Sequence, residues 1–240
     1  MITKLRMMWR IGLALGLLLV CLGGYGISRL FGPAHGWKRF FLRTACRIIG
    51  IDVAVEGMPV TGNVLLVSNH VSWLDILAIG GVAGARFVSK AEVANWPVVG
   101  MIARIGDTVL VERESRRAVR GQADQLSAAL LQGRPVVLFP EGTTGDGRTL
   151  LPFRPSLLAT VSTPPPGIVV QPVAIDYGDA TPDIAWPDGE SMGANAARII
   201  ARPGRIRATL RFLPPLPPID DRKALAAAAQ AAIAAALPGA

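Results

Sequence analysis

Histidine and cysteine are scarce in this sequence, which holds two of each among 240 residues. Cys21 and Cys46 form no Cys-x-x-Cys pair, and no pair of histidines stands at metal-ligand spacing, which argues against a zinc site or a dithiol redox centre. A Walker loop and a G-x-G-x-x-G turn after a strand are also missing. We therefore expect no metal, no cofactor and a compartment that keeps thiols reduced.

Acidic side chains are absent from residues 1–50, which contain eight Lys or Arg. The other 190 residues balance at 17 basic and 17 acidic side chains, so the net charge of +8 belongs to the N-terminus. A nucleic-acid-binding protein would more often spread its basic patch over the folded domain, and we expect no nucleic acid partner. Basic residues beside apolar segments favour an anionic membrane surface.

A run of 18 uncharged residues, 11–28, lies between Arg10 and Arg29. As a helix it would be about 27 Å long, just enough to span the hydrocarbon core of a bilayer. A cleaved signal peptide is the alternative, but Tyr25-Gly26-Ile27 is a poor cleavage site. Because basic residues flank both ends, the orientation is not set, and a re-entrant or shallowly inserted helix stays open.

Residues 35–50, HGWKRFFLRTACRIIG, have the periodicity of an amphipathic helix. Such a helix lies in the membrane interface or packs on the core of a domain, and one helix can do both. The positions predicted on its apolar arc are Trp37, Phe40, Phe41, Thr44, Ala45 and Ile48.

From residue 51 onward, short runs rich in β-branched residues alternate with helical patterns. The runs predicted as strands are 51–57, 64–68, 86–90, 108–112, 135–139, 168–175 and 206–213. The segments predicted as helices are 72–82, 91–104, 115–132, 154–162, 191–201 and 221–236. This alternation predicts an α/β fold with a largely parallel or mixed sheet flanked by helices. We expect one catalytic domain, 51–240, behind N-terminal membrane-associated helices, 1–50.

Polar side chains follow four of the predicted strands, at the point where each strand ends. These residues are His70, Lys90, Arg113 and Glu141. Ligands of open α/β sheets gather at the carboxyl ends of the strands, so the pattern indicates one site built from these four.

His70 and Asp75, in SNHVSWLD, have the chemistry of a general base and the carboxylate that orients it. Their spacing needs a turn between them, and we expect Ser72 to be the N-cap of the next helix. A purely structural interpretation is equally open, because Ser72-x-x-Asp75 is also a shortened capping box.

The sequence contains no convincing partner nucleophile for this histidine. GESMG, residues 189–193, matches the nucleophile-elbow pattern, but AWPDGE before it is not a strand and no histidine follows Ser191. A serine hydrolase is therefore disfavoured. Glu141, in FPEGTTGDGR, can accept hydrogen bonds from substrate hydroxyls or orient a basic residue. The alternative interpretation is that Glu141 is a solvated residue on a turn, without a role in a site.

NHVSWLD, FPEGTTGDG and VVQPVAI, in this order, resemble motifs of the glycerolipid acyltransferases, above all the 1-acylglycerol-3-phosphate O-acyltransferases. The resemblance covers about residues 35–215. It implies direct acyl transfer from acyl-CoA or acyl-carrier protein to a lysolipid hydroxyl, with His70 as the base, Asp75 as its partner and no acyl-enzyme.

The resemblance also implies roles for the other polar residues and a place in the cell. Glu141, Gly142 and Thr143 match the acceptor-binding motif, and Lys90 and Arg113 match basic positions associated with the acceptor phosphate. Membrane lipids are the implied partners, with the catalytic domain on the cytoplasmic face.

The second motif departs from the family pattern G-x-x-F-I-D-R. In GDTVLVER, Leu110 replaces Phe, Glu112 replaces Asp, and the glycine is one residue early. Ser156 stands where many members have Gly. These changes resemble a branch that includes lyso-ornithine-lipid O-acyltransferases. We rank lysophosphatidate first as acceptor and lyso-ornithine lipid close behind. A non-catalytic lipid-binding protein is the alternative of another class.

Overall fold

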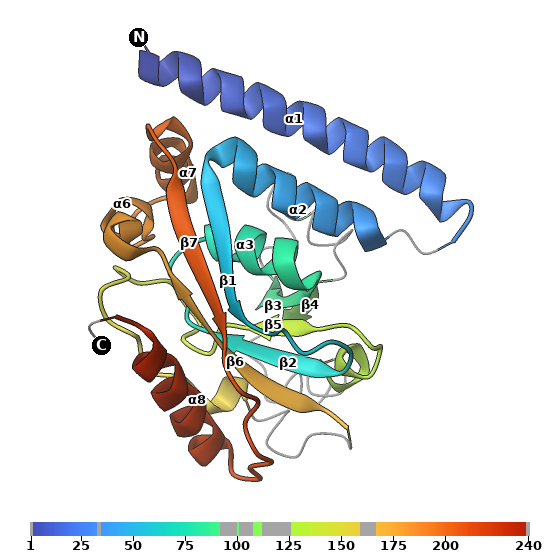
Figure 1. The fold of residues 1–240 in the computed structure, drawn as a ribbon, viewed down its shortest axis with the longest axis vertical. Coiled ribbons are helices and arrows are strands. Elements are labelled where there is room, and N and C mark those ends of the chain that lie inside the picture. Colours follow the sequence, from blue (N-terminus) through green and yellow to red (C-terminus); the bar gives the residue numbers. More distant parts are fainter. Residues whose placement is uncertain are drawn as a thin grey trace.

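The computed structural model describes residues 2–32, 35–91, 100, 108–111, 126–158 and 167–238 (Figure 1). Its strands are β1 (Ile51–Gly57), β2 (Val64–Ser68), β3 (Arg86–Lys90), β4 (Val109–Val111), β5 (Val136–Leu138), β6 (Val169–Asp176) and β7 (Ile206–Phe212). The α-helices with given bounds are α1 (Ile2–Arg29), α2 (His35–Ile49), α3 (Leu74–Ala83), α6 (Thr181–Ile184), α7 (Met192–Ala201) and α8 (Arg222–Ala236). Short 3-10 turns cover Pro155–Leu157 (η2) and Gly178–Ala180 (η3).

The strands form one sheet in the order β1-β7-β6-β2-β5-β3-β4. Every neighbouring pair is parallel except β6 and β7, which are antiparallel. The predicted α/β class with a mixed sheet is thus confirmed. Because β6, β2, β5, β3 and β4 run the same way, their carboxyl ends meet at one edge of the sheet.

The central strand β2 is buried on both faces, as expected of a parallel strand that helices cover on either side. Val64 and Leu66 point into a core shared with α2, α3 and β7. Leu65 and Val67 point into a second core, shared with α8 and the helical residues 126–130. Figure 1 shows α8 and α3 on opposite sides of the sheet.

The long helix α1 lies across the outer side of α2 (Figure 1). The two helices approach closely at Gly24, where a Cβ atom would lie 2.3 Å from the Trp37 ring. The Trp37 indole also donates a 2.8 Å hydrogen bond to Ser28. Most of α1 remains outside the core, since Cys21 is its single buried residue.

Two arginines fasten the other end of α1 to α7. Arg6 donates to the Ala201 carbonyl, and Arg10 donates to the carbonyls of Ile200 and Arg202, at 2.9 to 3.1 Å. These carbonyls belong to the last turn of α7, where helix carbonyls lack partners and positive charge is favourable. Both ends of α1 therefore contact the same folded domain.

Most of the predicted elements are observed near the predicted bounds. The predicted helices 191–201 and 221–236 are α7 and α8, and 72–82 corresponds to α3, which begins two residues later. Segment 154–162 forms only a 3-10 turn within its described part. Most of 91–104 and 115–132 lies outside the described residues. The division into 1–50 and 51–240 stays a prediction.

The face that α2 buries is rotated from the predicted arc. Its buried positions are Leu42, Ala45, Cys46 and Ile49, whereas Phe40 is 50% exposed. The predicted arc assumed one apolar face, but α2 lies between two neighbours. The inner face packs on α3 and the sheet, and α1 covers part of the outer face.

Candidate active site

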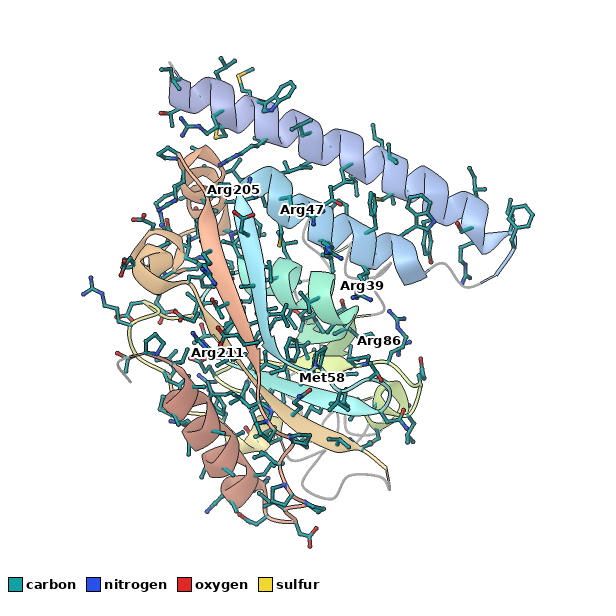
Figure 2. All side chains as sticks on the ribbon, viewed as in Figure 1. Arg39, Arg47, Met58, Arg86, Arg205 and Arg211 are labelled. Atoms are coloured by element: carbon teal, nitrogen blue, oxygen red, sulfur yellow. The ribbon has the colours of Figure 1, made fainter. Side chains whose placement is uncertain are left out.

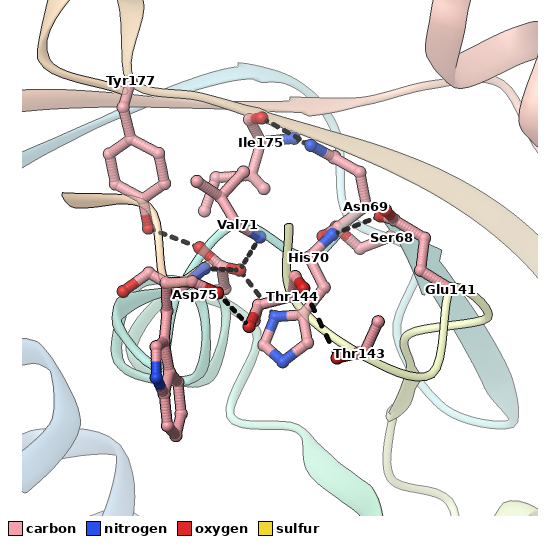
Figure 3. Close-up of polar contacts among 12 residues, drawn as sticks. Ser68, Asn69, His70, Val71, Asp75, Glu141, Thr143, Thr144, Ile175 and Tyr177 are labelled. Carbon is pink, nitrogen blue, oxygen red and sulfur yellow. Dashed lines mark hydrogen bonds and ion pairs between the residues drawn. The ribbon is translucent and has the colours of Figure 1, made fainter. Parts of the chain in front are cut away.

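Three loops that leave the carboxyl ends of β2, β5 and β6 meet at one edge of the sheet (Figure 3). They carry His70, Glu141 and Tyr177, respectively. Asp75 comes from the first turn of α3, which follows the β2 loop. The site thus forms where parallel strands converge, as predicted for His70 and Glu141.

His70 and Asp75 form a hydrogen-bonded pair. The Nδ1 atom of His70 lies 2.8 Å from Asp75 Oδ2, and the two side chains are 17% and 0% exposed. A carboxylate at Nδ1 fixes the tautomer that carries the proton on Nδ1 and leaves a lone pair on Nε2. No residue that the structure describes bonds to Nε2. The imidazole is therefore arranged to accept a proton at Nε2.

The Asp75 carboxylate is held by four donors. Oδ2 accepts from the backbone N–H groups of Val71 and Ser72 at 2.7 and 3.0 Å as well as from His70. Oδ1 accepts from the Tyr177 hydroxyl at 2.7 Å. Burial, together with the neighbouring Asp75 carboxylate, raises the pKa of Tyr177 well above its usual value, so this hydroxyl stays a donor. Four donors offset the desolvation of a fully buried carboxylate.

The expected N-cap at Ser72 is wrong. The N-cap residue of α3 is Trp73, and no side chain caps this helix end. The hydroxyl of Ser72 is buried without a partner among the described residues. Asp75 supplies the reason, because its carboxylate reaches back to the N–H groups of residues 71 and 72, as in a capping box. Asp75 therefore orients His70 and ties the helix start at the same time.

Glu141 is buried, at 4% exposure, so the interpretation as a solvated turn residue is wrong. Its Oε1 accepts from the backbone N–H of His70 at 2.7 Å, and its Oε2 accepts from Leu151 N–H at 3.1 Å. Burial raises the pKa of Glu141 to about 7, although these two hydrogen bonds act to lower it. Within the described chain, Glu141 binds the histidine backbone rather than a basic side chain.

Two residues that position His70 were not predicted. Asn69 bonds the backbone of Ile175 in both directions, accepting from its N–H at 2.8 Å and donating to its carbonyl at 2.9 Å. Phe139 stacks on the His70 ring with centroids 4.0 Å apart and planes 12° apart. Both residues are the first members of the quoted motifs NHVSWLD and FPEGTTGDG, and their place beside His70 and Glu141 in the sequence was the available signal.

The structure describes fewer contacts for the remaining predicted site residues. Lys90 is the last residue of β3, at the same edge of the sheet. The side chain of Lys90 and the whole of Arg113 lie outside the described residues. Gly142 follows Glu141 with φ of 74°, a backbone conformation that favours glycine. The Thr143 hydroxyl donates to the Thr144 carbonyl at 3.4 Å. Figure 3 shows these threonines beside the His70 ring.

A cavity of about 530 Å³ opens at His70 and Glu141. Its lining combines apolar residues, such as Leu150 and Ile175, with charged ones. The charged residues beyond the pair itself are Arg148, Asp176 and Asp179. The base at His70 therefore opens onto a space with room for a ligand. In the described chain, no group of His, Cys, Asp and Glu side chains can hold a metal ion.

Ser191 has a structural role. Its Oγ atom accepts a hydrogen bond from Ala194 N–H at 3.2 Å and caps the start of α7. The position of Ser191 at a helix N-terminus accounts for its appearance in an elbow-like pattern. The sequence argument against a serine nucleophile there agrees with this geometry.

Comparison with known proteins identifies the family. Residues 51–176 match the acyltransferase family. The chain is 38% identical to the lyso-ornithine lipid O-acyltransferase of Brucella abortus (strain 2308), over 80% of this chain and 79% of that protein. It is 40% identical to the lyso-ornithine lipid O-acyltransferase of Rhizobium meliloti (strain 1021), over 72% of this chain but only 59% of the length of that relative.

More distant similarity extends to proteins named for another acceptor. The 1-acyl-sn-glycerol-3-phosphate acyltransferase of Neisseria meningitidis serogroup B is 37% identical over 55% of this chain and 51% of that protein. The crystal structure of the 1-acyl-sn-glycerophosphate acyltransferase PlsC from Thermotoga maritima has the same fold. It superposes with a TM-score of 0.71 at 23% identity, over 98% of this chain and 95% of that one. The predicted family is confirmed: the chain belongs to the glycerolipid acyltransferases, a family of enzymes.

Proposed function

We propose that this enzyme moves a fatty acyl group to the free hydroxyl of a lyso-ornithine lipid. The observation that carries the acyl-transfer chemistry is the His70–Asp75 pair, held at 2.8 Å with Nε2 free of protein partners in the described chain. From the sequence alone, we ranked lysophosphatidate above lyso-ornithine lipid as the acyl acceptor. The relatives named lyso-ornithine lipid O-acyltransferase reverse that order, because they match more of this chain than the Neisseria protein does.

The reaction proceeds without an acyl-enzyme. Nε2 of His70 takes the proton of the lysolipid hydroxyl while that oxygen attacks the carbonyl carbon of the acyl thioester. The tetrahedral intermediate then collapses, the carbon–sulfur bond breaks, and the leaving thiolate receives the proton from His70. Asp75 stabilises the imidazolium in between, and such a base contributes about 10²–10⁴ to the rate. The donor is acyl-CoA or acyl-carrier protein, and no cofactor takes part.

The charges of the cavity support a zwitterionic acceptor. An ornithine headgroup with one acylated amine carries one carboxylate and one ammonium, whereas a phosphate monoester carries about −1.5 to −2. The cavity offers Arg148 for a carboxylate, and Asp176 and Asp179 for an ammonium. Arg211 binds Asp176 and Glu56 together, so this cluster keeps one excess negative charge. A phosphate there would meet carboxylates.

The enzyme works at a membrane surface in this proposal. The most apolar 18-residue window of helix α1 has a mean hydropathy of 2.0, and only 6% of that window is buried, so most of its surface is free for lipid. Since both ends of α1 contact the same domain, a helix that spans the bilayer would have to break one of these contacts. We therefore place α1 in the plane of one leaflet, with the catalytic domain on the cytoplasmic face, where the charged acyl donors are found.

Purified protein in detergent tests the proposal. Acyl-carrier protein or acyl-CoA is supplied with an equimolar mixture of lyso-ornithine lipid and lysophosphatidate, and both products are quantified. We expect the ornithine product to dominate and His70→Ala to abolish it, with the solvent-exposed Asp220→Asn as control. Dominant lysophosphatidate turnover would reject the acceptor, and undiminished transfer by His70→Ala would reject the base.

The same assay separates the proposal from other functions. A non-catalytic lipid-binding protein would bind both lipids without turnover, and His70→Ala would then change stability alone. A lipid hydrolase would release fatty acid from an ester with water as the only co-substrate. Either result would contradict the proposal.

A further inference from the structure

A second cavity, of about 280 Å³, lies between α2, α3 and β1, away from His70. Arg39, Arg43 and Arg47 line it, and their four-residue spacing puts them on one face of α2. Figure 2 shows Arg39 and Arg47 along the side of α2 that faces α3 and β1. The apolar part of the lining comprises Cys46, Ile51, Val53, Val55, Leu77, Ala78 and Val82. We call this cavity the arginine groove.

The carboxylates of the described chain do not balance the positive charge of the arginine groove. Its one acidic residue, Asp52, accepts two hydrogen bonds from Arg205, and these bonds, together with the charges of Arg205 and Arg47, lower the pKa of Asp52. A single carboxylate that Arg205 already binds cannot neutralise three arginines. No carboxylate of a described residue lies within ion-pair distance of the three groove arginines. Like charges at four-residue spacing repel one another. An anion from outside the protein would relieve this repulsion.

The chemistry of the groove matches a phosphate on an apolar stem. Arginine binds phosphate through two parallel hydrogen bonds, and Arg39 is already oriented, because its Nε donates to the Gly81 carbonyl at 3.3 Å. Burial raises the pKa of Cys46 to about 12, so the groove floor carries no thiolate. The three arginines suit the phosphate of a phospholipid headgroup. The apolar part of the lining suits the glycerol beside that phosphate, and the acyl chains would extend into the membrane.

The neighbouring helix α1 identifies the source of that phosphate. Large apolar side chains of α1 are exposed, for example Trp9, Leu19 and Ile27 at 67%, 71% and 63%. Because α2 packs directly on α1, its axis lies about 10 Å from that of α1. When α1 is immersed among acyl chains, the groove arginines then lie near the headgroups. We propose that the arginine groove binds the phosphate of an anionic phospholipid, separately from the acyl acceptor.

Vesicle co-sedimentation at physiological ionic strength tests the proposal. The probes are phosphatidylcholine vesicles containing either phosphatidylglycerol or oleate, matched in surface charge, and the readout is the partition coefficient. Arg43→Gln/Arg47→Gln leaves the Arg39 bond to Gly81 intact. Near an anionic surface each basic residue contributes about fivefold in affinity, so we expect about 25-fold weaker binding to phosphatidylglycerol vesicles. The control, Arg207→Gln/Arg222→Gln, removes two exposed charges elsewhere.

Two further arms identify the occupant. Arg43→Lys/Arg47→Lys keeps the charge but loses the planar fork, so it should bind phosphatidylglycerol vesicles less tightly than wild type, whereas purely diffuse attraction would leave the binding unchanged. Titration with inorganic phosphate and glycerol 3-phosphate should show much weaker binding than the vesicles. Acyl transfer in neutral detergent should be unchanged in all three variants, which checks that each one is folded.

Several outcomes would overturn the proposal. Equal losses of vesicle binding in the groove and control variants would indicate diffuse charge instead of a site. Equal binding of wild type to both kinds of anionic vesicle would indicate the same. Tight binding of inorganic phosphate would make a free anion the occupant. Unchanged vesicle binding with a raised KM for acyl-carrier protein alone would assign the groove to docking of an acidic donor protein.

Discussion

Replacing Asp75 by asparagine separates the charge of this carboxylate from its hydrogen bonds. Asparagine has nearly the same shape, and its carbonyl oxygen can take the place of Oδ2, which accepts from two backbone N–H groups. The amide nitrogen then faces Tyr177, whose hydroxyl can rotate from donor to acceptor. The fold should therefore survive, whereas the imidazolium loses the negative charge 2.8 Å from Nδ1.

The expected effect of Asp75→Asn is almost entirely kinetic. If Asp75 makes His70 an effective base, its loss should remove most of the 10²–10⁴ that such a base contributes, or about 3–5 kcal/mol of transition-state stabilisation. Steady-state acyl transfer gives kcat, and urea unfolding gives the free energy of unfolding. Asp75→Ala is the comparison, since it leaves four donors without an acceptor, each at about 1–3 kcal/mol, and should unfold the site. A folded Asp75→Asn enzyme within tenfold of wild-type kcat would refute the reasoning.

Three other perturbations follow from the contacts of the site and of α1. The pKa of Glu141 is raised from 4.5 to about 7, so its contribution to stability is fully present below pH 4.5 and is lost as the pH rises through 7. Urea unfolding across that window should show a decline of about 3 kcal/mol that Glu141→Gln lacks; an identical decline in both proteins would contradict this assignment. Tyr177→Phe removes a buried hydrogen bond to Asp75 and should lower the free energy of unfolding by about 1.5–3 kcal/mol, measured in the same way, and an unchanged value would show that Asp75 needs no donor there. Gly24→Ala places a Cβ 2.3 Å from an α2 ring, whereas Gly16→Ala meets nothing within 4 Å, so thermal unfolding in detergent should show a lowered Tm for Gly24→Ala alone. Equal Tm values would mean that α1 does not pack on α2 in solution.

The strands were predictable because buried parallel strands have a strong local signature. VLLVS and PVVLF are short, β-branched and bounded by turn residues, and both contain strands of the sheet. Their order in the sheet and the antiparallel pairing of β6 with β7 were not predictable, since periodicity carries no information on strand direction. The start of α3 was misjudged because capping by Ser72 and capping by Asp75 have the same sequence pattern.

Motif chemistry predicted the pairing of His70 with Asp75, but it did not predict the residues that hold this pair in place. His70 and Asp75 are five residues apart, so their pairing is a local matter. Tyr177 meets Asp75 across 102 residues, and its position depends on β6 lying beside β2. A tyrosine after an apolar strand has no feature in the sequence that distinguishes it from a core tyrosine. Long-range contacts of this kind require the sheet order that the sequence left open.

The arrangement around His70 determines how substrate must reach it. The backbone of His70 is bound by Glu141, its ring is stacked on Phe139, and Nδ1 is bound by Asp75. These three restraints leave Nε2 as the one ring nitrogen that is open to a substrate. The imidazole is therefore already in position before the substrate binds. The base cannot move to follow a lysolipid that diffuses in the bilayer. The lipid hydroxyl must be brought to Nε2, and in the proposed placement of α1 within one leaflet, the depth at which α1 and α2 hold the domain would set whether it arrives.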